Sequence, residues 1–483
     1  MTYGPHTDGD RARMLAALGI SSVDVLFDDI PPAVRAAGLD LPPALTEMEL
    51  MARLRELASH NRVDLASFLG AGAYRHHVPP VVDQILLRGE FYTAYTPYQP
   101  EVSQGTLQTI YEYQSLVAEL TGLDVVSASH YDGAAATAEA ALMTCRQARR
   151  ERVLLSRGVH RQYRDTLSTY FSGANLAFDE VPLLTDGPAA GTTDLAALEW
   201  LLADPDRPVA GVLAAQPNVL GLLEPMAEIG RLAHAAGALF AAVVEPVSLG
   251  VLAPPGAYGA DIAAGEGQPL GLPLSYGGPY LGILACRDAL VRQIPGRLVG
   301  MTTDLEGRRA YVMTMRAREQ DIRREKAASN ICSNQALCAL AAAVWLAALG
   351  PGGLRDVAAT GAARAAELEA ALAAAGAPRI HSGPYLNELV VRVPDAVAVH
   401  RRLLTHGVLA GIPTAELEPD DPALADGLLV CATEVTTPGE IEVFAFALRE
   451  ELVAGIGTLP SGAAAAAPGA PPPGAAATAE VRP

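Results

Sequence analysis

Residues 209–245 read VAGVLAAQPNVLGLLEPMAEIGRLAHAAGALFAAVVE, and this stretch decides the fold class of the chain. Two apolar runs of strand length, 209–214 and 239–244, flank a segment of helical length and composition at 227–236. A strand, a helix and a second strand in this order form a βαβ unit with parallel strands. A further strand at 153–155 and a helix at 196–202 continue the alternation upstream. We therefore predict an α/β protein with a large, mostly parallel sheet.

The C-terminal part predicts a second, smaller α/β domain. An apolar run at 336–349 ends at Gly350-Pro351-Gly352-Gly353, a strong break between elements. Helix, strand, helix and strand are then predicted, in that order, at 355–375, 386–393, 396–406 and 428–433. The predicted organisation is an N-terminal segment with an interface loop, a large domain, a small C-terminal domain and a disordered Ala/Pro/Gly tail, at 1–100, 101–344, 345–458 and 459–483.

Composition excludes several classes of protein. The formal net charge of -19 argues against a nucleic-acid binder, which needs clustered Lys and Arg. The first residues, MTYGPH, carry no apolar core of a secretory signal. The longest apolar run, 336–349, is shorter than the ~20 residues that span a bilayer. We expect a cytoplasmic protein that binds neither nucleic acid nor membrane.

Cysteine and lysine usage limits the possible chemistry. The five cysteines are scattered without CxxC spacing, so free thiols are expected and no metal site. The chain contains a single lysine, Lys326. Compositional drift toward arginine accounts for most surface positions. A mechanism that needs a Schiff base nevertheless has only Lys326, because arginine stays protonated and is not nucleophilic.

Two segments could carry a ligand. The first, 92–105, is a polar and aromatic turn before a helix that Gly122 would end; its tyrosines either pack against the sheet or hold a ligand. The second is Asp132-Gly133-Ala134-Ala135-Ala136-Thr137, which follows a strand at 125–128 and opens a helix. Small residues at such a turn either seat an anion on backbone N–H groups or allow close packing.

Four motifs carry a resemblance to a known family. YTAYTPYQPEVSQGTLQTIYEYQ, YDGAAATAEA, GADIAAGEGQPLGLPLSYGGPYLG and REQDIRREKAASNICSNQAL begin at residues 92, 131, 259 and 318. Together they resemble the P-protein of glycine decarboxylase, and in particular subunit 1 of the form split into two chains. The similarity extends from about residue 10 to 458. It implies the aspartate aminotransferase-like fold (fold type I of the transferases that depend on pyridoxal phosphate).

The resemblance also implies what this chain lacks. In that fold class a lysine carries the cofactor, after the strand that holds the acid pairing with the pyridine nitrogen. Here the corresponding stretch reads Gln268-Pro269, and neither residue can form a Schiff base. Lys326 lies far beyond it in the charged run RREK, where a solvated position is expected. Candidate remnants of a cofactor cup are Asp132, Gly133 and Thr137, the ring-stacking His160 and the pairing acid Glu245. For His160 and Glu245 a structural role is favoured over contact with a ligand.

The family further implies a division of labour between two subunits. Subunit 2 would hold pyridoxal phosphate on its lysine, and this chain would complete the pocket from across the interface, in a heterotetramer of two such pairs. The candidate contacts to substrate or interface are Tyr95, Thr96, Tyr98, Gln99, Glu101 and Ser103, with Arg318 and Glu319 as a weaker second group. The implied activity is that of glycine dehydrogenase (aminomethyl-transferring). Glycine loses CO2, and its aminomethyl group passes to the lipoyl arm of the H-protein.

Two alternatives remain at the level of the sequence. The chain could be a self-sufficient transferase of the same fold that uses Lys326. It could instead be a non-catalytic scaffold that stabilises its partner or docks the H-protein. A Schiff base on the isolated chain would favour the first alternative. Loss of turnover on mutation of the YTPYQ loop, with assembly intact, would exclude the second.

Overall fold

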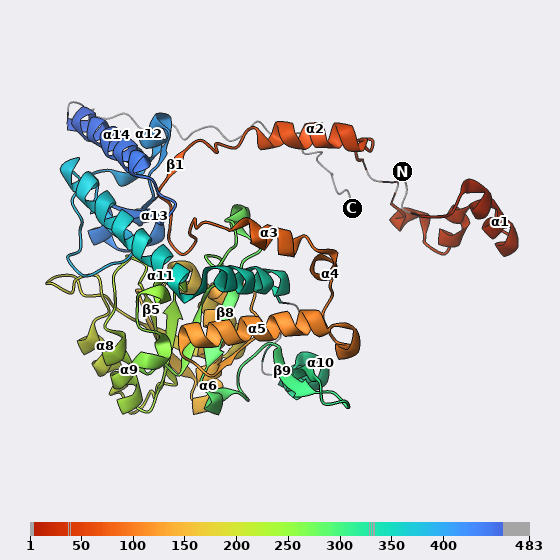
Figure 1. Cartoon of the computed structure of the whole chain (residues 1–483), viewed down its shortest axis with the longest axis horizontal. Coiled ribbons are helices and arrows are strands. Elements are labelled where there is room, and N and C mark those ends of the chain that lie inside the picture. The colour runs from red at the N-terminus through yellow and green to blue at the C-terminus, as the bar shows by residue number, and fades with distance from the viewer. Residues whose placement is uncertain are drawn as a thin grey trace. The chain divides into compact units, whose positions relative to one another are not determined.

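The computed structural model describes residues 4–36, 38, 40–327, 329, 331 and 334–456 (Figure 1). The predicted tail at 459–483 therefore lies outside the described residues. The chain divides into two compact units, residues 1–63 and 64–483. The first unit contains the helices α1 (Asp8–Leu18) and α2 (Glu47–Ala58) and the 3-10 helices η1 (Val23–Phe27) and η2 (Pro32–Val34). Thr7 and Thr46 open α1 and α2 with capping boxes.

A seven-stranded sheet forms the centre of the second unit, as predicted. Its strand order is β2-β8-β7-β6-β5-β3-β4. Strands β4, β3, β5, β6 and β7 are parallel, whereas β8 runs antiparallel to both of its neighbours. The strands are β2 (Val125–Val126), β3 (Arg152–Ser156), β4 (Ala177–Val181), β5 (Gly211–Gln216), β6 (Leu239–Val244), β7 (Ile262–Glu266) and β8 (Gly282–Cys286).

Helices pack on the sheet because its parallel strands are apolar on both faces. One core contains side chains of α6 and α7 against the sheet, and another contains side chains of α8 and α9. Gly122 ends α5 in a left-handed conformation (φ 65°), as predicted. The helices of this part are α3 (Pro80–Leu86), α4 (Gly89–Tyr92), α5 (Gln104–Thr121), α6 (Gly133–Ala148), α7 (Arg161–Ala174), α8 (Leu195–Leu202) and α9 (Met226–Ala235).

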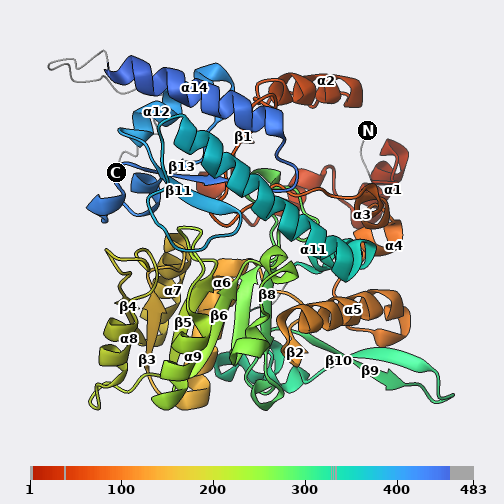
Figure 2. The same cartoon turned by 60° about the vertical axis from the view of Figure 1, so that its left-hand side comes forward.

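A smaller C-terminal layer lies beyond one end of these strands (Figure 2). Its sheet has the order β11-β14-β13 and is antiparallel, and β1 pairs with β12 beside it. The segment at 66–67 thus joins the C-terminal layer rather than the N-terminal elements. The layer contains β1 (Ala66–Ser67), β11 (Glu388–Arg392), β12 (Val408–Leu409), β13 (Ile412–Pro413), β14 (Gly427–Cys431), α12 (Ala396–Leu403), α13 (Thr414–Leu417) and α14 (Pro438–Ile456).

Helix α11 (Ala336–Ala374) connects the two layers. Helical geometry breaks at Gly350 (φ 62°, ψ -178°), where the sequence predicted a break. Trp345, before the break, is fully buried and donates its indole N–H to the carbonyl of His77 at 3.0 Å. By length and composition alone, α11 is the one described helix apolar enough to cross a membrane, but half of its most apolar window is buried inside the protein.

Between β8 and α11 in the chain lie a hairpin and a short helix. Strands β9 (Leu298–Thr303) and β10 (Arg309–Thr314) pair in antiparallel register. Helix α10 (Gln320–Arg323) and the 3-10 turn η9 (Arg324–Lys326) follow. Side chains of α5, β9 and β10 share a small apolar core, so the hairpin is fixed against α5.

The sheet has a topological switch point between β3 and β5. From β3 the chain passes outward to β4 and then returns to β5 on the other side of β3. Ligands of open α/β sheets bind in the crevice at the carboxyl ends of strands next to such a point. The search for a site therefore begins at the residues that follow β3, β5, β6 and β7.

Candidate functional site: an acidic cavity and a tyrosine loop

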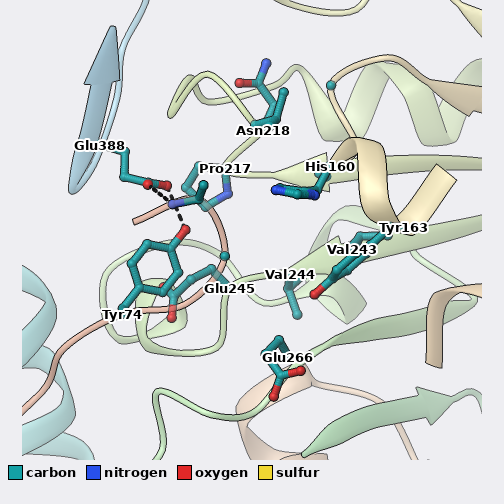
Figure 3. Close-up of a pocket in the computed structure, with 15 residues that line it drawn as sticks. Tyr74, His160, Tyr163, Pro217, Asn218, Val243, Val244, Glu245, Glu266 and Glu388 are labelled. Atoms are coloured by element: carbon teal, nitrogen blue, oxygen red, sulfur yellow. Dashed lines mark hydrogen bonds between the residues drawn. The ribbon is translucent and has the colours of Figure 1, made fainter. Parts of the chain in front are cut away.

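A cavity opens at the carboxyl ends of the parallel strands (Figure 3). It has a volume of about 550 Å³, including its open mouth. Residues after β3 and β5, the ends of β6 and β7, the start of β11 and the segment at 71–74 line it. The polar side chains among them are Tyr74, His160, Tyr163, Asn218, Glu245, Glu266 and Glu388. The sequence predicted two of these, His160 and Glu245.

Glu266, at the end of β7, occupies the amino end of α6. Its Oε2 accepts a hydrogen bond from the backbone N–H of Gly133 at 2.9 Å. Its Oε1 accepts from the N–H groups of Gln268 and Leu281, both at 2.9 Å. Burial raises the pKa of Glu266 to about 7 in spite of these three donors. The N–H group of Gly133, the first residue of α6, is therefore bonded to a carboxylate of the chain itself.

Three predicted cup residues belong to the start of α6. Asp132 is the N-cap, and its carboxylate accepts from the N–H of Ala135 at 2.7 Å. Gly133 packs so closely under Tyr163 that a Cβ atom here would lie 2.2 Å from the tyrosine hydroxyl. The hydroxyl of Thr137 donates back to the carbonyl of Gly133 at 2.8 Å. Asp132, Gly133 and Thr137 thus have roles in capping and packing the start of α6.

Glu388 lies opposite, at the start of β11, and connects the C-terminal layer to the cavity. It is 4% exposed and accepts from the N–H of Ala71 and the hydroxyl of Tyr74, both at 2.6 Å. Burial raises the pKa of Glu388 to about 7. Figure 3 shows both hydrogen bonds at the rim of the cavity.

Glu245 and His160 are placed by the elements that follow β6 and β3. The carboxylate of Glu245 accepts from the N–H groups of Val247 at 2.9 Å and Ser248 at 2.6 Å, which caps the 3-10 helix η4 (Val247–Gly250). Burial raises its pKa. His160 is the N-cap of α7, where its Nδ1 accepts from the N–H of Gln162 at 3.1 Å. Burial lowers the pKa of His160, which favours the neutral ring.

These residues do not fit pyridoxal phosphate. No lysine lines the cavity, and the single Lys326 is exposed in η9. At the start of α6, the N–H of Gly133 is bonded to Glu266 and that of Ala135 to Asp132. Three glutamates line the walls and no arginine does, so no cation there would neutralise a phosphate dianion. The cavity therefore has the position of a cofactor site but not its chemistry.

The tyrosine loop lines a different cavity. Tyr95 and Thr96 lie there beside Arg297 and residues of α5, α11 and β9, and none of the lining residues is shared with the first cavity. Tyr95 is 84% exposed. Gln99 and Glu101 are exposed, and Ser103 precedes α5 without a capping hydrogen bond from its side chain. The structure thus divides the predicted site residues between two places.

Tyr98 lies between two arginines that the sequence did not suggest together. The guanidinium carbons of Arg297 and Arg316 lie 5.5 Å and 5.3 Å from the centre of its ring. Arg297 also donates from Nη2 to the hydroxyl of Tyr98 at 3.2 Å. Because 199 positions separate Tyr98 from Arg297, no local pattern could indicate this contact.

The second predicted group, Arg318 and Glu319, lines a small cavity with Arg297. Arg318 donates to the carbonyls of Met315 and Gly296, each at 3.2 Å. Burial raises the pKa of Glu319. Among the described residues, no group of three His, Cys, Asp or Glu side chains could hold a metal ion.

Comparison with solved structures defines the class of protein. Sphingosine-1-phosphate lyase of Burkholderia pseudomallei aligns with a TM-score of 0.63 at 16% identity, over 87% of this chain and 94% of that one. Alanine-glyoxylate aminotransferase of Nostoc aligns with a TM-score of 0.54 at 17% identity, over 86% and 98%. At such identity the likeness concerns the fold alone. The fold is that of the type I enzymes that depend on pyridoxal phosphate, as predicted.

Sequence comparisons then identify the family. The profile described as "Glycine cleavage system P-protein" matches residues 1–445. "Probable glycine dehydrogenase (decarboxylating) subunit 1" of Moorella thermoacetica is 52% identical over 452 residues, which cover 93% of this chain and 99% of that protein. Its counterpart in Carboxydothermus hydrogenoformans is 48% identical over 445 residues, covering 92% and 98%. The chain belongs to the glycine cleavage system P-protein family, in the group of its subunit 1 relatives.

A solved member of the family has the same fold over nearly the whole chain. The structure entitled "Crystal structure of glycine decarboxylase (P-protein) of the glycine cleavage system, in inhibitor-bound form" aligns with a TM-score of 0.85 at 44% identity. The alignment covers 93% of this chain and all of that one. The predicted family is therefore confirmed by sequence and by structure.

Proposed function

We propose that this chain is the subunit of a cytoplasmic glycine decarboxylase that does not carry the cofactor, and that it completes the active site of subunit 2. The observation that supports this most directly is the chemistry of the cavity at the switch point. It has three glutamates and no lysine, and the first N–H group of α6 is bonded to Glu266. A family whose reaction depends on pyridoxal phosphate then needs the cofactor on another chain. Subunit 2 is the partner that the name of the subunit 1 relatives implies.

The tyrosine loop is the part of this chain that we assign to the shared site. Tyr95 projects from it with 84% of its surface exposed. Burial within this chain therefore stabilises its large aromatic side chain very little. An exposed polar and aromatic loop held by a rigid scaffold is typical of a binding segment. Thr96 and Tyr95 line a cavity with Arg297, so the loop would present hydroxyl groups and a positive charge together.

The proposed reaction removes CO2 from glycine and transfers the aminomethyl group to the lipoyl arm of the H-protein. The contribution of this chain would be to orient glycine and to exclude water. Hydroxyl groups of the loop can donate hydrogen bonds to the substrate without adding a negative charge. The apolar residues of the same cavity, among them Ile110 and Leu340, lower the local polarity, which favours the loss of a carboxylate as CO2.

A second candidate function is that of a scaffold, and one observation favours it. The glutamates that line the cavity at the switch point accept capping and bridging hydrogen bonds from this chain. Their carboxylates thus have structural roles in this chain. A scaffold would support subunit 2 or dock the H-protein without contacting substrate. The two functions differ in what mutation of the exposed loop does.

The first experiment measures glycine-bicarbonate exchange and borohydride trapping of pyridoxal phosphate. We expect no exchange and no trapped adduct with this chain alone. The mixture with subunit 2 should be active, with the adduct on subunit 2. A stable adduct on Lys326 of the isolated chain would contradict the proposal and make the chain an independent enzyme.

The second experiment replaces Tyr95 by alanine in the complex. The exchange rate should fall on the order of 10- to 100-fold, because misplacement of a substrate by about 1 Å has this effect. Trp200 on α8 is the matched control: it is 76% exposed and lines neither cavity, so Trp200→Ala should leave the rate unchanged. An unchanged rate in the assembled Tyr95→Ala complex would favour the scaffold.

A further inference from the structure

Arg297 is a buried charge without a counterion in the part of the chain that the structure describes. Its residue is 9% exposed, and it precedes β9 at the base of the hairpin. No carboxylate oxygen of the described residues lies within 4.0 Å of its guanidinium group. Its Nε is buried and has no hydrogen-bond partner among the residues that the structure describes. Within the described part of the chain, its side chain donates one hydrogen bond, to the hydroxyl of Tyr98.

The other buried arginines of the described chain are paired. Arg152 is 5% exposed and lies 2.6 Å from a carboxylate oxygen of Asp179. Arg164 is 6% exposed and contacts both Glu180 and Glu418. An unpaired buried charge costs several kcal/mol, so proteins retain one only where something else compensates it. Arg297 is therefore the most deeply buried arginine of the described chain that has no salt bridge.

Glu319 acts on Arg297 only at longer range, since burial raises the pKa of Glu319 although the charge of Arg297 lowers it. Glu319 lies with Arg297 in the small cavity, but its carboxylate is beyond salt-bridge distance, and one of its oxygens has no hydrogen-bond partner among the described residues. Arg316 and Arg318 add further positive charge around Tyr98 and Glu319. In a chain with a net charge of -19, this concentration of arginine is a local reversal of sign.

The position of Arg297 connects this charge to the tyrosine loop. It lines the cavity that contains Tyr95 and Thr96 as well as the small cavity with Glu319. A guanidinium group offers a planar fork of donors that matches a carboxylate or a phosphate. The missing partner of Arg297 thus has a defined chemistry and a defined place.

We propose that Arg297 is the anion-binding residue of the shared active site, and that it binds a carboxylate or phosphate group presented by the partner subunit. This inference rests on the proposed function, because only a second chain would bring such a group to the loop. The anion has two possible sources, which are the carboxylate of glycine and the phosphate of the cofactor. Tyr98 has a positioning role, since it holds the guanidinium group by its hydroxyl and its ring.

The test in the complex uses Arg297→Gln and Arg297→Lys. Arg309→Gln is the matched control, because Arg309 also lies over a tyrosine ring, at 6.0 Å from Tyr311, but is exposed and lines neither cavity. We expect Arg297→Gln to raise either the KM for glycine or the half-saturating concentration of pyridoxal phosphate about 10- to 100-fold, the range for loss of a charged hydrogen bond. Arg297→Lys should have an intermediate effect, and Arg309→Gln none.

The outcome identifies the source of the anion. A change confined to the KM for glycine assigns the substrate carboxylate, and a change confined to pyridoxal phosphate assigns the cofactor phosphate. If neither changes in the assembled complex while Tyr95→Ala still lowers exchange, the proposed function stands and this inference falls. If the mixture with subunit 2 shows no exchange at all, the proposed function itself falls.

A second measurement needs only the isolated chain. Arg297→Met removes an uncompensated buried charge, so it should raise the melting temperature by about 2–4 °C. Arg164→Met breaks a pair with Glu180 and Glu418 and should lower the melting temperature. Equal destabilisation by the two substitutions would show that Arg297 is a structural residue and would overturn the inference.

Discussion

Glu388 is a single residue that connects several segments around the cavity at the switch point. Its carboxylate bridges the backbone of Ala71 and the hydroxyl of Tyr74, which ties the segment before α3 to the C-terminal layer. Gly221 packs so closely on Glu388 that a Cβ atom there would lie 2.1 Å from the glutamate carbonyl. The residue thus joins three segments, and its ionisation is suppressed by its burial.

The first prediction concerns the pH dependence of stability. The pKa of Glu388 is about 7 in the folded chain and near 4.5 when unfolded, so ionisation opposes folding. This penalty is absent below pH 4.5, grows as the pH rises and is complete above pH 7, where it amounts to roughly 3 kcal/mol. A glutamine at this position can keep both hydrogen bonds without ionising, because the hydroxyl of Tyr74 can also accept one. Glu388→Gln should therefore flatten the decline between pH 5 and 8 in urea unfolding.

The control for this prediction is the exposed Glu442 on α14. Glu442→Gln should leave the pH dependence of the free energy of unfolding as it is in the unmodified chain. A Glu388→Gln variant whose stability declines as steeply as that of the unmodified chain would show that Glu388 ionises freely.

At the scale of elements, α11 contributes side chains to the cores of both layers. Its first half packs Trp345 under the large sheet, and its second half packs Leu368 and Leu372 under the C-terminal layer. The break at Gly350 sets the angle between these halves. With φ 62° and ψ -178°, Gly350 occupies a region that residues with a Cβ atom rarely adopt.

The second prediction follows from this backbone conformation. Gly350→Ala should destabilise the chain by about 1–3 kcal/mol, measured by urea unfolding, because an alanine is strained there. Gly352 lies two residues further in the same helix, with a negative φ and open space around its Cα. Gly352→Ala should be neutral or stabilise by up to about 1 kcal/mol. A loss of the same size at both positions would attribute the effect to something other than the break.

Elements of this kind could be predicted from sequence because their signals are local. Apolar runs gave β6 at its observed bounds, and glycine with proline gave the break in α11. The position of Glu266 at the start of α6 could not be predicted, because 133 residues separate it from Gly133. The missing counterion of Arg297 is likewise visible only once the neighbours of its side chain are known. The pattern around Asp132 is typical both of an anion-binding helix start and of a helix start capped by its own side chain, so the sequence could not distinguish them.

At the scale of the whole molecule, the cavity in the position of a cofactor site and the cluster of positive charge lie at different places. The cavity at the carboxyl ends of β3, β5, β6 and β7 lies where this fold binds its cofactor, yet carboxylates line it. The positive charge instead gathers around Tyr98, at the loop that we assign to the shared site. An enzyme formed by this chain and subunit 2 would then need both chains. Subunit 2 would provide the lysine and the cofactor, and this chain would provide the loop.

The last prediction tests this separation without measuring activity. A ligand at 100 times its Kd stabilises the folded state by about 2.7 kcal/mol, so pyridoxal phosphate should raise the melting temperature of any chain that binds it. We expect no shift for the isolated chain, because Glu266 occupies the N–H of Gly133 and the cavity is acidic. The mixture with subunit 2 should show a clear upward shift under the same conditions. A comparable shift in the isolated chain would mean that the phosphate displaces Glu266. The substitution Glu266→Gln, which removes the competing charge, should then enlarge that shift.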